Sequence, residues 1–280
     1  LSRELAAKGV QITILCEHDH SEGELAGVKT IQLAHSPAKP RWFSHLCFSR
    51  KVSDWLCRHP IEGRIVHSHE RQRDHHLTTI HSTLFNYPCS WSMPTPRKWA
   101  NEWLERRELN GPRLKAIVPV SKVVAKQINA KRPDASNKVK APIHPGTELK
   151  LKKRMTKREG RRQVIGFMGS EWKRKGLLKV IEVWRKLSLE RPNLELRLAG
   201  FPSETQLNLG PMQRERVKSL GWIDDKSAFF DGLDLLMHPA RLEAYGMVIA
   251  EAMAMQVPVL CSEECGAADE VAQAFGEVIR

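Results

Sequence analysis

The stretch LDLLMHPARLEAYGMVIAEAMAMQVPVLC, residues 233–261, decides how the rest of the chain is interpreted. Its apolar runs predict a buried strand over 233–238, a loop that ends at Gly246, a helix over 247–255 and a second short strand over 257–261. Two carboxylates, Glu243 and Glu251, bracket the loop and the helix start with seven residues between them. A unit of strand, loop, helix and strand is typical of a parallel α/β sheet.

The start of the predicted helix is a candidate anion site. The first backbone N–H groups of a helix lack partners within it, and the helix dipole favours negative charge there. Glu243 lies at the edge of that site and Glu251 further into the helix. A carboxylate accepts hydrogen bonds from hydroxyl groups, so Glu251 would bind a ribose and Glu243 a sugar. The pattern therefore predicts a nucleotide sugar. Four residues around the helix start would bind its diphosphate: Tyr245, Gly246, Met247 and Val248.

The same block carries a family resemblance. The sequence E-A-Y-G-M-V-I-A-E, preceded by D-L-L-M-H-P and followed by A-M-A-M-Q-V-P-V-L-C-S, resembles the E-x7-E block of family-4 retaining glycosyltransferases. A bare pair of glutamates at this spacing would fit a solvated helix face, whereas the flanking strands and the glycine favour the family. The resemblance implies an α/β, GT-B fold, with two Rossmann-like parallel-sheet domains and an interdomain cleft.

The domain boundary is predicted within the basic run 148–162. Residues 1–148 would form an N-terminal acceptor-side domain, and residues 149–280 a C-terminal nucleotide-sugar-binding domain. The sequence opens on a predicted helix, whereas a doubly wound sheet begins with a strand and a glycine turn. By comparison with the family, the first strand and the C-terminal crossing helix are therefore expected to be lacking.

A second phosphate-binding pattern follows the predicted strand 163–169. Gly169 precedes S-E-W-K-R-K-G-L, and a glycine with basic residues before a helix is a layout that binds phosphate. It resembles the family's G-x(n)-R-K-G pattern, which assigns Arg174 and Lys175 to the donor diphosphate. The resemblance also assigns Gly200 to a turn near the nucleotide base. Main chain near Trp222 would meet the base edge, although a packed Trp is the commoner outcome.

Five histidines gather within residues 67–81, so a metal site has to be weighed. An H-x-H after a predicted strand, followed by Asp74 and a histidine, resembles the metallo-β-lactamase-type hydrolase pattern, but the Asp-His pair comes too late for that spacing. The glycosyltransferase resemblance implies instead that T-T-I-H-S ends a strand, where His81 reaches the donor sugar across the cleft. A metal-dependent hydrolase remains an alternative. The five residues are His67, His69, His75, His76 and His81.

Composition limits the partners. Residues 1–150 hold 24 Lys and Arg against 14 Asp and Glu, and the net charge of the chain is +13. We expect an anionic glycan or glycolipid acceptor and peripheral contact with an anionic membrane, although a merely soluble basic surface fits the charge as well. No nucleic acid partner is expected. No apolar run approaches the roughly 20 residues of a membrane helix. The six cysteines form no C-x-x-C pair and are expected to be reduced.

Together the patterns predict a retaining glycosyltransferase that moves a hexose from a nucleoside-diphosphate sugar to a glycan or lipid-linked acceptor. The catalytic residues would be Arg174, Lys175, Glu243 and His81, with no metal and no cofactor. A UDP-sugar is the first donor candidate, with GDP- and ADP-sugars as alternatives. The resemblance to the lipopolysaccharide-core glucosyltransferase branch implies that the acceptor is lipopolysaccharide core. It also implies a location at the cytoplasmic face of the inner membrane. A non-catalytic nucleotide-sugar-binding protein is the remaining alternative.

Overall fold

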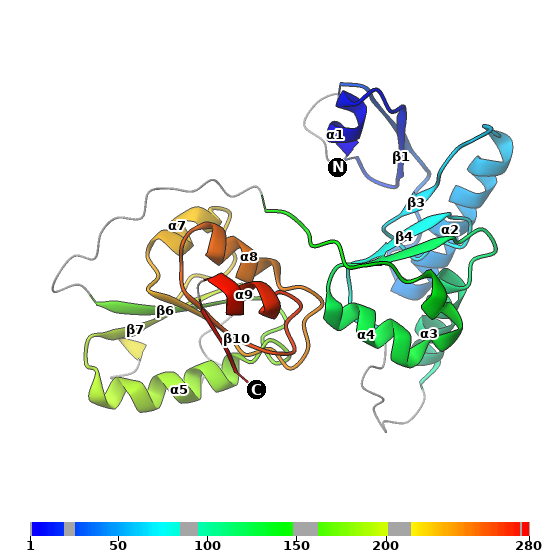
Figure 1. Ribbon diagram of the computed structural model, residues 1–280. Helices are drawn as coiled ribbons and strands as arrows, with labels where there is room; N and C mark the ends of the chain where they lie inside the picture. Colours follow the sequence, from blue (N-terminus) through cyan, green and yellow to red (C-terminus); the bar gives the residue numbers. More distant parts are fainter. Residues whose placement is uncertain are drawn as a thin grey trace. The chain divides into compact units, whose positions relative to one another are not determined.

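The computed structural model describes residues 2–19, 26–84, 95–147, 162–200, 214–274 and 276–279. The chain divides into two compact units (Figure 1). The first contains Leu1–Ile80, Leu84–Val118 and Gln127–Ala141, and the second contains His81–Thr83, Pro119–Lys126 and Pro142–Arg280. The predicted boundary between residues 148 and 149 lies outside the described residues and remains a prediction.

The strands of the first half form two sheets. One pairs β1 with β2 in parallel, and the other has the order β3-β4-β5, in which β3 and β4 are parallel. In a doubly wound sheet of order 3-2-1-4-5-6, the first strand joins the two sides. Here the two strands before α2 and the three strands after it pair separately. The elements are α1 (Ser2–Ala7), β1 (Ile12–Cys16), β2 (Val28–Gln32), α2 (Arg41–Arg58), β3 (His67–Ser68), β4 (Leu77–Ile80), α3 (Pro96–Leu109), β5 (Ala116–Pro119), α4 (Lys122–Lys131) and η1 (Pro133–Lys138).

The second unit is built on one six-stranded parallel sheet of order β11-β10-β9-β6-β7-β8. The chain runs outward from β6 to β8 and then returns to β9, so β6 and β9 are neighbours in the middle of the sheet. In open α/β sheets this switch in strand order marks the place where ligands bind. The elements are β6 (Gln163–Met168), α5 (Leu177–Glu190), β7 (Leu194–Ala199), β8 (Val217–Ser219), α7 (Lys226–Asp231), β9 (Leu235–His238), α8 (Met247–Ala254), β10 (Val259–Ser262), α9 (Ala268–Ala274) and β11 (Gly276–Ile279).

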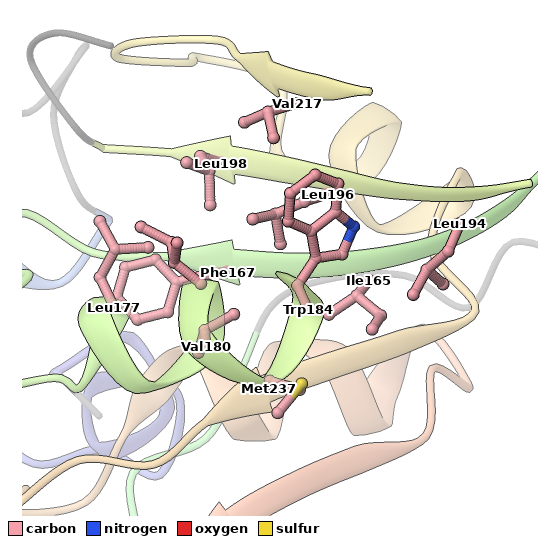
Figure 2. Close-up of a cluster of buried hydrophobic side chains, with 11 residues drawn as sticks. Ile165, Phe167, Leu177, Val180, Trp184, Leu194, Leu196, Leu198, Val217 and Met237 are labelled. Atoms are coloured by element: carbon pink, nitrogen blue, oxygen red, sulfur yellow. The ribbon is translucent and has the colours of Figure 1, made fainter. Parts of the chain in front are cut away.

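The core of this unit lies between α5 and the sheet. Figure 2 shows Trp184 of α5 turned toward the strands, with Phe167 and Leu196 beside it. All three side chains are fully buried. The cluster has eleven members, and burying each of its large side chains contributes about 1.5–3 kcal/mol. The α5 helix is thereby held firmly against β6 and β7, and its N-terminus is fixed at the carboxyl end of the sheet.

Two glycines begin the helices on either side of the switch point. Gly176 precedes α5 with φ 86°, and Gly246 precedes α8 with φ 94°, a left-handed conformation that favours glycine. A Cβ on Gly176 would also overlap the carbonyl oxygen of Pro239, which follows β9. The loops after β6 and β9 can therefore approach each other closely only because a glycine stands at this position.

Short segments from the first half of the sequence belong to the second unit. The Oγ of Ser121 donates a hydrogen bond to the carbonyl oxygen of Ala244. The Nζ of Lys122 lies 2.8 Å from Oδ2 of Asp269, and His144 pairs with Glu270. Ser121, Lys122 and His144 thus contact the loop that carries Glu243 and the helix α9, in addition to the contacts that the C-terminal residues make among themselves.

The central prediction of strand, loop, helix and strand is confirmed with small shifts at the ends. The predicted strand 233–238 is observed as β9, the predicted helix 247–255 as α8, and the predicted strand 257–261 as β10. The strand β11 was not predicted. Within the described ranges, no helix combines the length and hydrophobicity needed to cross a membrane.

Candidate functional site

Three of the predicted site residues meet where the loops after β6 and β9 come together. The NH1 atom of Arg174 lies 3.3 Å from Oε2 of Glu243 and also donates to the carbonyl oxygen of Leu242. The Nζ of Lys175 lies 3.7 Å from the same Oε2. A main-chain hydrogen bond of 2.9 Å from Arg241 N to Arg174 O fastens the two loops together. The structure thus brings both cations and one carboxylate to the switch point of the sheet.

Glu243 is strongly biased toward its charged form. Burial opposes the charge, but His238, Lys175 and Arg174 outweigh it and hold the pKa of Glu243 at about 2. The carboxylate is therefore ionised at every pH near neutrality. It can accept hydrogen bonds from a ligand and cannot donate them.

The start of α8 fits the predicted anion site. Gly246 is the residue before the helix and, as a glycine, has no side chain of its own to cap it. Of the four residues predicted around this start, Tyr245 and Val248 are buried and Met247 is partly exposed. Tyr245 packs against the ring of His144, with 5.4 Å between the ring centroids. A Cβ on Gly246 would lie 3.4 Å from Cγ of Glu243, so Glu243 is close to the helix start as well as to the two cations.

Glu251 lies inside α8 and is almost buried, with 9% of its side chain exposed. Its Oε1 accepts a hydrogen bond of 2.7 Å from Nζ of Lys226, the first residue of α7. The predicted contact of Glu251 with a ribose therefore involves a carboxylate that already has one cationic neighbour. Sequence analysis missed Lys226, because nothing in the spacing between α7 and α8 indicates that they meet.

The glycines at the strand ends allow close backbone approach. A Cβ on Gly169 would lie 2.5 Å from Cδ of Lys175, so the absence of a side chain leaves room for the lysine. Gly200 has φ 72°, and its N–H donates to Gly221 O over 2.6 Å. Trp222 follows with 76% of its surface exposed, so it is not a packed core residue. Its proximity to a nucleotide base stays a prediction.

His238 is the second residue that the sequence analysis did not select. It is the last residue of β9, is completely buried, and places Nε2 at 3.7 Å from Oε2 of Glu243. The motif D-L-L-M-H-P was visible in the sequence, but it did not reveal which way the imidazole would point. A histidine that ends a central strand beside a switch point was the available signal.

Three of the histidines of residues 67–81 have different hydrogen-bond partners, and the rings of His67 and His69 lie 4.3 Å apart. His67 contacts Thr79 Oγ1 at 2.7 Å, His75 contacts the carbonyl oxygen of Glu108 at 3.0 Å, and Nδ1 of His76 accepts from Val66 N. Among the described residues, no group of three or more His, Cys, Asp or Glu side chains is arranged to hold a metal ion. The geometry offers no support for the alternative of a metal hydrolase.

His81 directly follows β4 and has an exposed side chain. Its proposed contact with the sugar of a donor remains a prediction. The five cysteines within the described ranges are free in the structure, and their reduced state stays a prediction: Cys16, Cys47, Cys57, Cys261 and Cys265.

Comparison with known proteins shows which family the site resembles. Residues 162–277 match the family model for "Glycosyl transferases group 1". This matched domain covers less than half of the chain. The domain contains β6, both loops at the switch point and α8, so the predicted site residues from Gly169 to Glu251 all lie within it.

Two curated relatives match part of this domain. Over 113 residues the chain is 34% identical to the lipopolysaccharide glucosyltransferase WaaG of Escherichia coli K12 and 27% identical to the capsular polysaccharide biosynthesis glycosyltransferase CapM of Staphylococcus aureus. The aligned regions cover 38% and 39% of this chain, and 30% of each relative's length.

Solved structures extend the likeness in fold to the rest of the chain. The crystal structure of WaaG matches 99% of this chain and 79% of its own, with a TM-score of 0.76 and 20% identity. A sucrose-phosphate synthase from Thermosynechococcus elongatus matches 99% of this chain and 77% of its own, with a TM-score of 0.71 and 17% identity. The predicted GT-B fold class and the resemblance to the lipopolysaccharide-core branch are confirmed.

Proposed function

We propose that the protein is a retaining glycosyltransferase that moves a hexose from a nucleoside-diphosphate sugar to a glycan or lipid-linked hydroxyl. The observation that carries this proposal is the meeting of Arg174, Lys175 and Glu243 near Gly246, the glycine that begins α8. Cations and helix amides suit a diphosphate, and an ionised carboxylate suits the hydroxyls of a sugar.

In the proposed reaction, the cations and the helix amides have to stabilise the charge of the leaving diphosphate. When the bond from the sugar to the diphosphate breaks, negative charge grows on the leaving phosphate. Fixed donors aimed at that charge lower the barrier, and each contributes about 2–4 kcal/mol. Arg174, Lys175 and the amides of α8 would supply this stabilisation without a metal ion. In the front-face route implied by the family resemblance, a phosphate oxygen takes the proton of the acceptor, so no side-chain nucleophile is needed.

The resemblance to other glycosyltransferases favours certain candidates for the donor and the acceptor. A UDP-sugar is the first donor candidate, and the fold is shared with HepE of Anabaena, solved in complex with UDP, at a TM-score of 0.61 and 15% identity. The names of WaaG and CapM indicate bacterial surface glycans. With the excess of basic residues in the first half, they favour an anionic glycan or glycolipid such as lipopolysaccharide core, met at the cytoplasmic face of a membrane.

Ligand-dependent melting of the full chain tests the proposed donor. UDP, GDP and ADP and their glucose conjugates would be compared, because a ligand at 100 times its Kd adds about 2.7 kcal/mol of stability. Lys175→Ala should abolish most of the shift in melting temperature. Lys179→Ala is the matched control, because Lys179 is an exposed lysine within α5. Equal shifts in wild type and Lys175→Ala would remove Lys175 from the site.

A turnover assay distinguishes a glycosyltransferase from a protein that only binds the nucleotide sugar. Release of nucleoside diphosphate from the selected donor would be followed with lipopolysaccharide-core acceptors of increasing length. Transfer with retained anomeric configuration, lost in Lys175→Ala and kept in Lys179→Ala, is the expected result. Tight nucleotide-sugar binding with no transfer to any acceptor would favour a non-catalytic binding protein instead.

A further inference from the structure

The side chain of His238 is a buried polar group of the second unit. It is completely buried, and among the described residues neither Nδ1 nor Nε2 has a partner within hydrogen-bond distance. The ring lies over Phe167, with the centroids 6.2 Å apart and the planes at 15°. Buried polar atoms are nearly always satisfied, and an unsatisfied one calls for an explanation. An aliphatic residue would fill this place at the end of β9 without that penalty.

The imidazole faces one particular oxygen. Its Nε2 lies 3.7 Å from Oε2 of Glu243, the same atom that Arg174 approaches at 3.3 Å and Lys175 at 3.7 Å. Three nitrogen groups thus surround Oε2, one from the end of a central strand and two from the loop before α5. Among the interactions of Glu243 found in the described ranges, those of its carboxylate go to Oε2, which leaves Oε1 to meet a ligand.

The three neighbours of Oε2 differ in their freedom to move. Arg174 and Lys175 have long side chains that are partly exposed, and a bound diphosphate would attract both. His238 is instead completely buried at the end of β9, and its ring stacks on Phe167 of β6. Once the cations turn to a ligand, the imidazole is the neighbour that still holds Oε2. The terminal torsion of a glutamate is soft, so such a fixed neighbour decides how the carboxylate is oriented.

We propose that His238 is a positioning residue that orients the Glu243 carboxylate, with Oε2 toward the imidazole and Oε1 toward the sugar hydroxyls of the donor. This inference rests on the proposed function and deepens it. It assigns the recognition of the sugar to His238 acting through Glu243, and the recognition of the diphosphate to the cations and to α8. The two parts of the donor are then bound by separable groups.

Binding of UDP and UDP-glucose to the full chain tests this separation. For His238→Ala we expect the Kd of UDP-glucose to rise about tenfold while the Kd of UDP stays within about twofold. His238→Gln, which keeps a donor near Oε2, should recover most of the loss. Met237→Leu is the matched control, because Met237 is the buried neighbour on β9 and packs in the core beside α5. A similar loss in Met237→Leu would overturn the proposal, because it would show a disturbed strand.

A double-mutant cycle checks that the effect passes through Glu243. In a Glu243→Gln background, His238→Ala should change the Kd of UDP-glucose by less than about twofold. An undiminished effect would contradict the proposal. Should the wild type bind neither UDP nor UDP-glucose, the proposed donor fails, and a ligand-free measurement still decides the inference. Carboxyl titration by NMR should then show a higher pKa for Glu243 in His238→Ala than in the wild type, and an unchanged pKa would overturn it.

Discussion

The Nζ of Lys226 lies 2.7 Å from Oε1 of Glu251 and joins the first residue of α7 to the middle of α8. Only 9% of the Glu251 side chain is exposed, whereas 46% of the Lys226 side chain is exposed. The lysine therefore satisfies a carboxylate that water hardly reaches, and it holds that carboxylate in place within α8. The pair links the local stability of α8 to the orientation of a group proposed to bind the ribose.

Lys226→Met should weaken both stability and nucleotide binding. The almost buried carboxylate would lose its donor, which we expect to cost about 1 kcal/mol of unfolding free energy. The Kd of UDP should rise several-fold, because Glu251 is no longer held in one orientation. Urea unfolding and calorimetric titration measure the two effects.

The ion pair of Lys186 with Glu182 on α5 provides the control. Its atoms are 3.0 Å apart, and both side chains are exposed, so Lys186→Met should change stability by less than about 0.5 kcal/mol. Equal losses in the two variants would show that burial of Glu251 has no special effect. Unchanged UDP binding in Lys226→Met would argue against a role of the pair at the site.

A second buried carboxylate predicts how stability depends on pH. Burial raises the pKa of Glu108 from 4.5 to about 8, even though the hydroxyl of Thr78 donates to its Oε1 over 3.0 Å. The folded state therefore binds more protons than the unfolded state between these two values. The stabilising contribution is complete below pH 4.5 and is lost as the pH rises to about 8.

Glu108→Gln should remove this dependence. In the wild type the unfolding free energy should fall across the window, by up to about 1.4 kcal/mol for each pH unit from this one group. The variant should show a flatter profile in urea titrations across this window. Glu102→Gln, at a half-exposed glutamate of the same helix, should keep the wild-type slope. A wild-type slope in Glu108→Gln would contradict the assignment.

Gly176→Ala should loosen the switch point. The added Cβ would overlap Pro239 O, and a residue other than glycine at φ 86° carries about 1–2 kcal/mol of backbone strain. Gly9→Ala is the control, because Gly9 has φ 81° and nothing lies within 4 Å of its Cβ position. Gly176→Ala should therefore be less stable than Gly9→Ala and should also bind UDP more weakly. Equal effects would show that the contact with Pro239 contributes nothing.

The packing of α5 gives a test of the core. Trp184→Ala removes a fully buried side chain and should lower the unfolding free energy by about 3–5 kcal/mol. Leu189→Ala, on the same helix with 83% of the residue exposed, should change it by less than about 0.5 kcal/mol. Urea unfolding compares the two, and a small effect of Trp184→Ala would place the core elsewhere.

The sequence predicted best where the signals are local. The run around Gly246 indicated β9, α8 and β10 to within two residues at most ends, because strand length, glycine and helix periodicity all occur in consecutive residues. The approach of Arg174 and Lys175 to Glu243 needed the family resemblance, since these residues are separated by nearly seventy positions. Their role toward a donor remains a prediction, although the structure brings them together.

The sequence could not reveal contacts that depend on the sheet order. His238 meets Glu243 through the path of the loop after β9, and Lys226 meets Glu251 because α7 and α8 are brought together in space. Neither pair has a characteristic spacing. The strand β11 was missed because GEVI is short and half polar, so that only its pairing with β10 identifies it.

Ser121, Lys122 and His144 precede the predicted domain boundary in sequence but belong to the second unit, so a shortened protein would lose their contacts. A fragment that begins at residue 149, where the change in sequence composition suggests a start, would leave the carbonyl of Ala244 without its hydroxyl donor and Glu270 without its imidazole neighbour. The exposed edge would adjoin the loop that carries Glu243. A shortened protein that contains only residues 162–277 would therefore lack side chains that normally contact the loop of the proposed binding site.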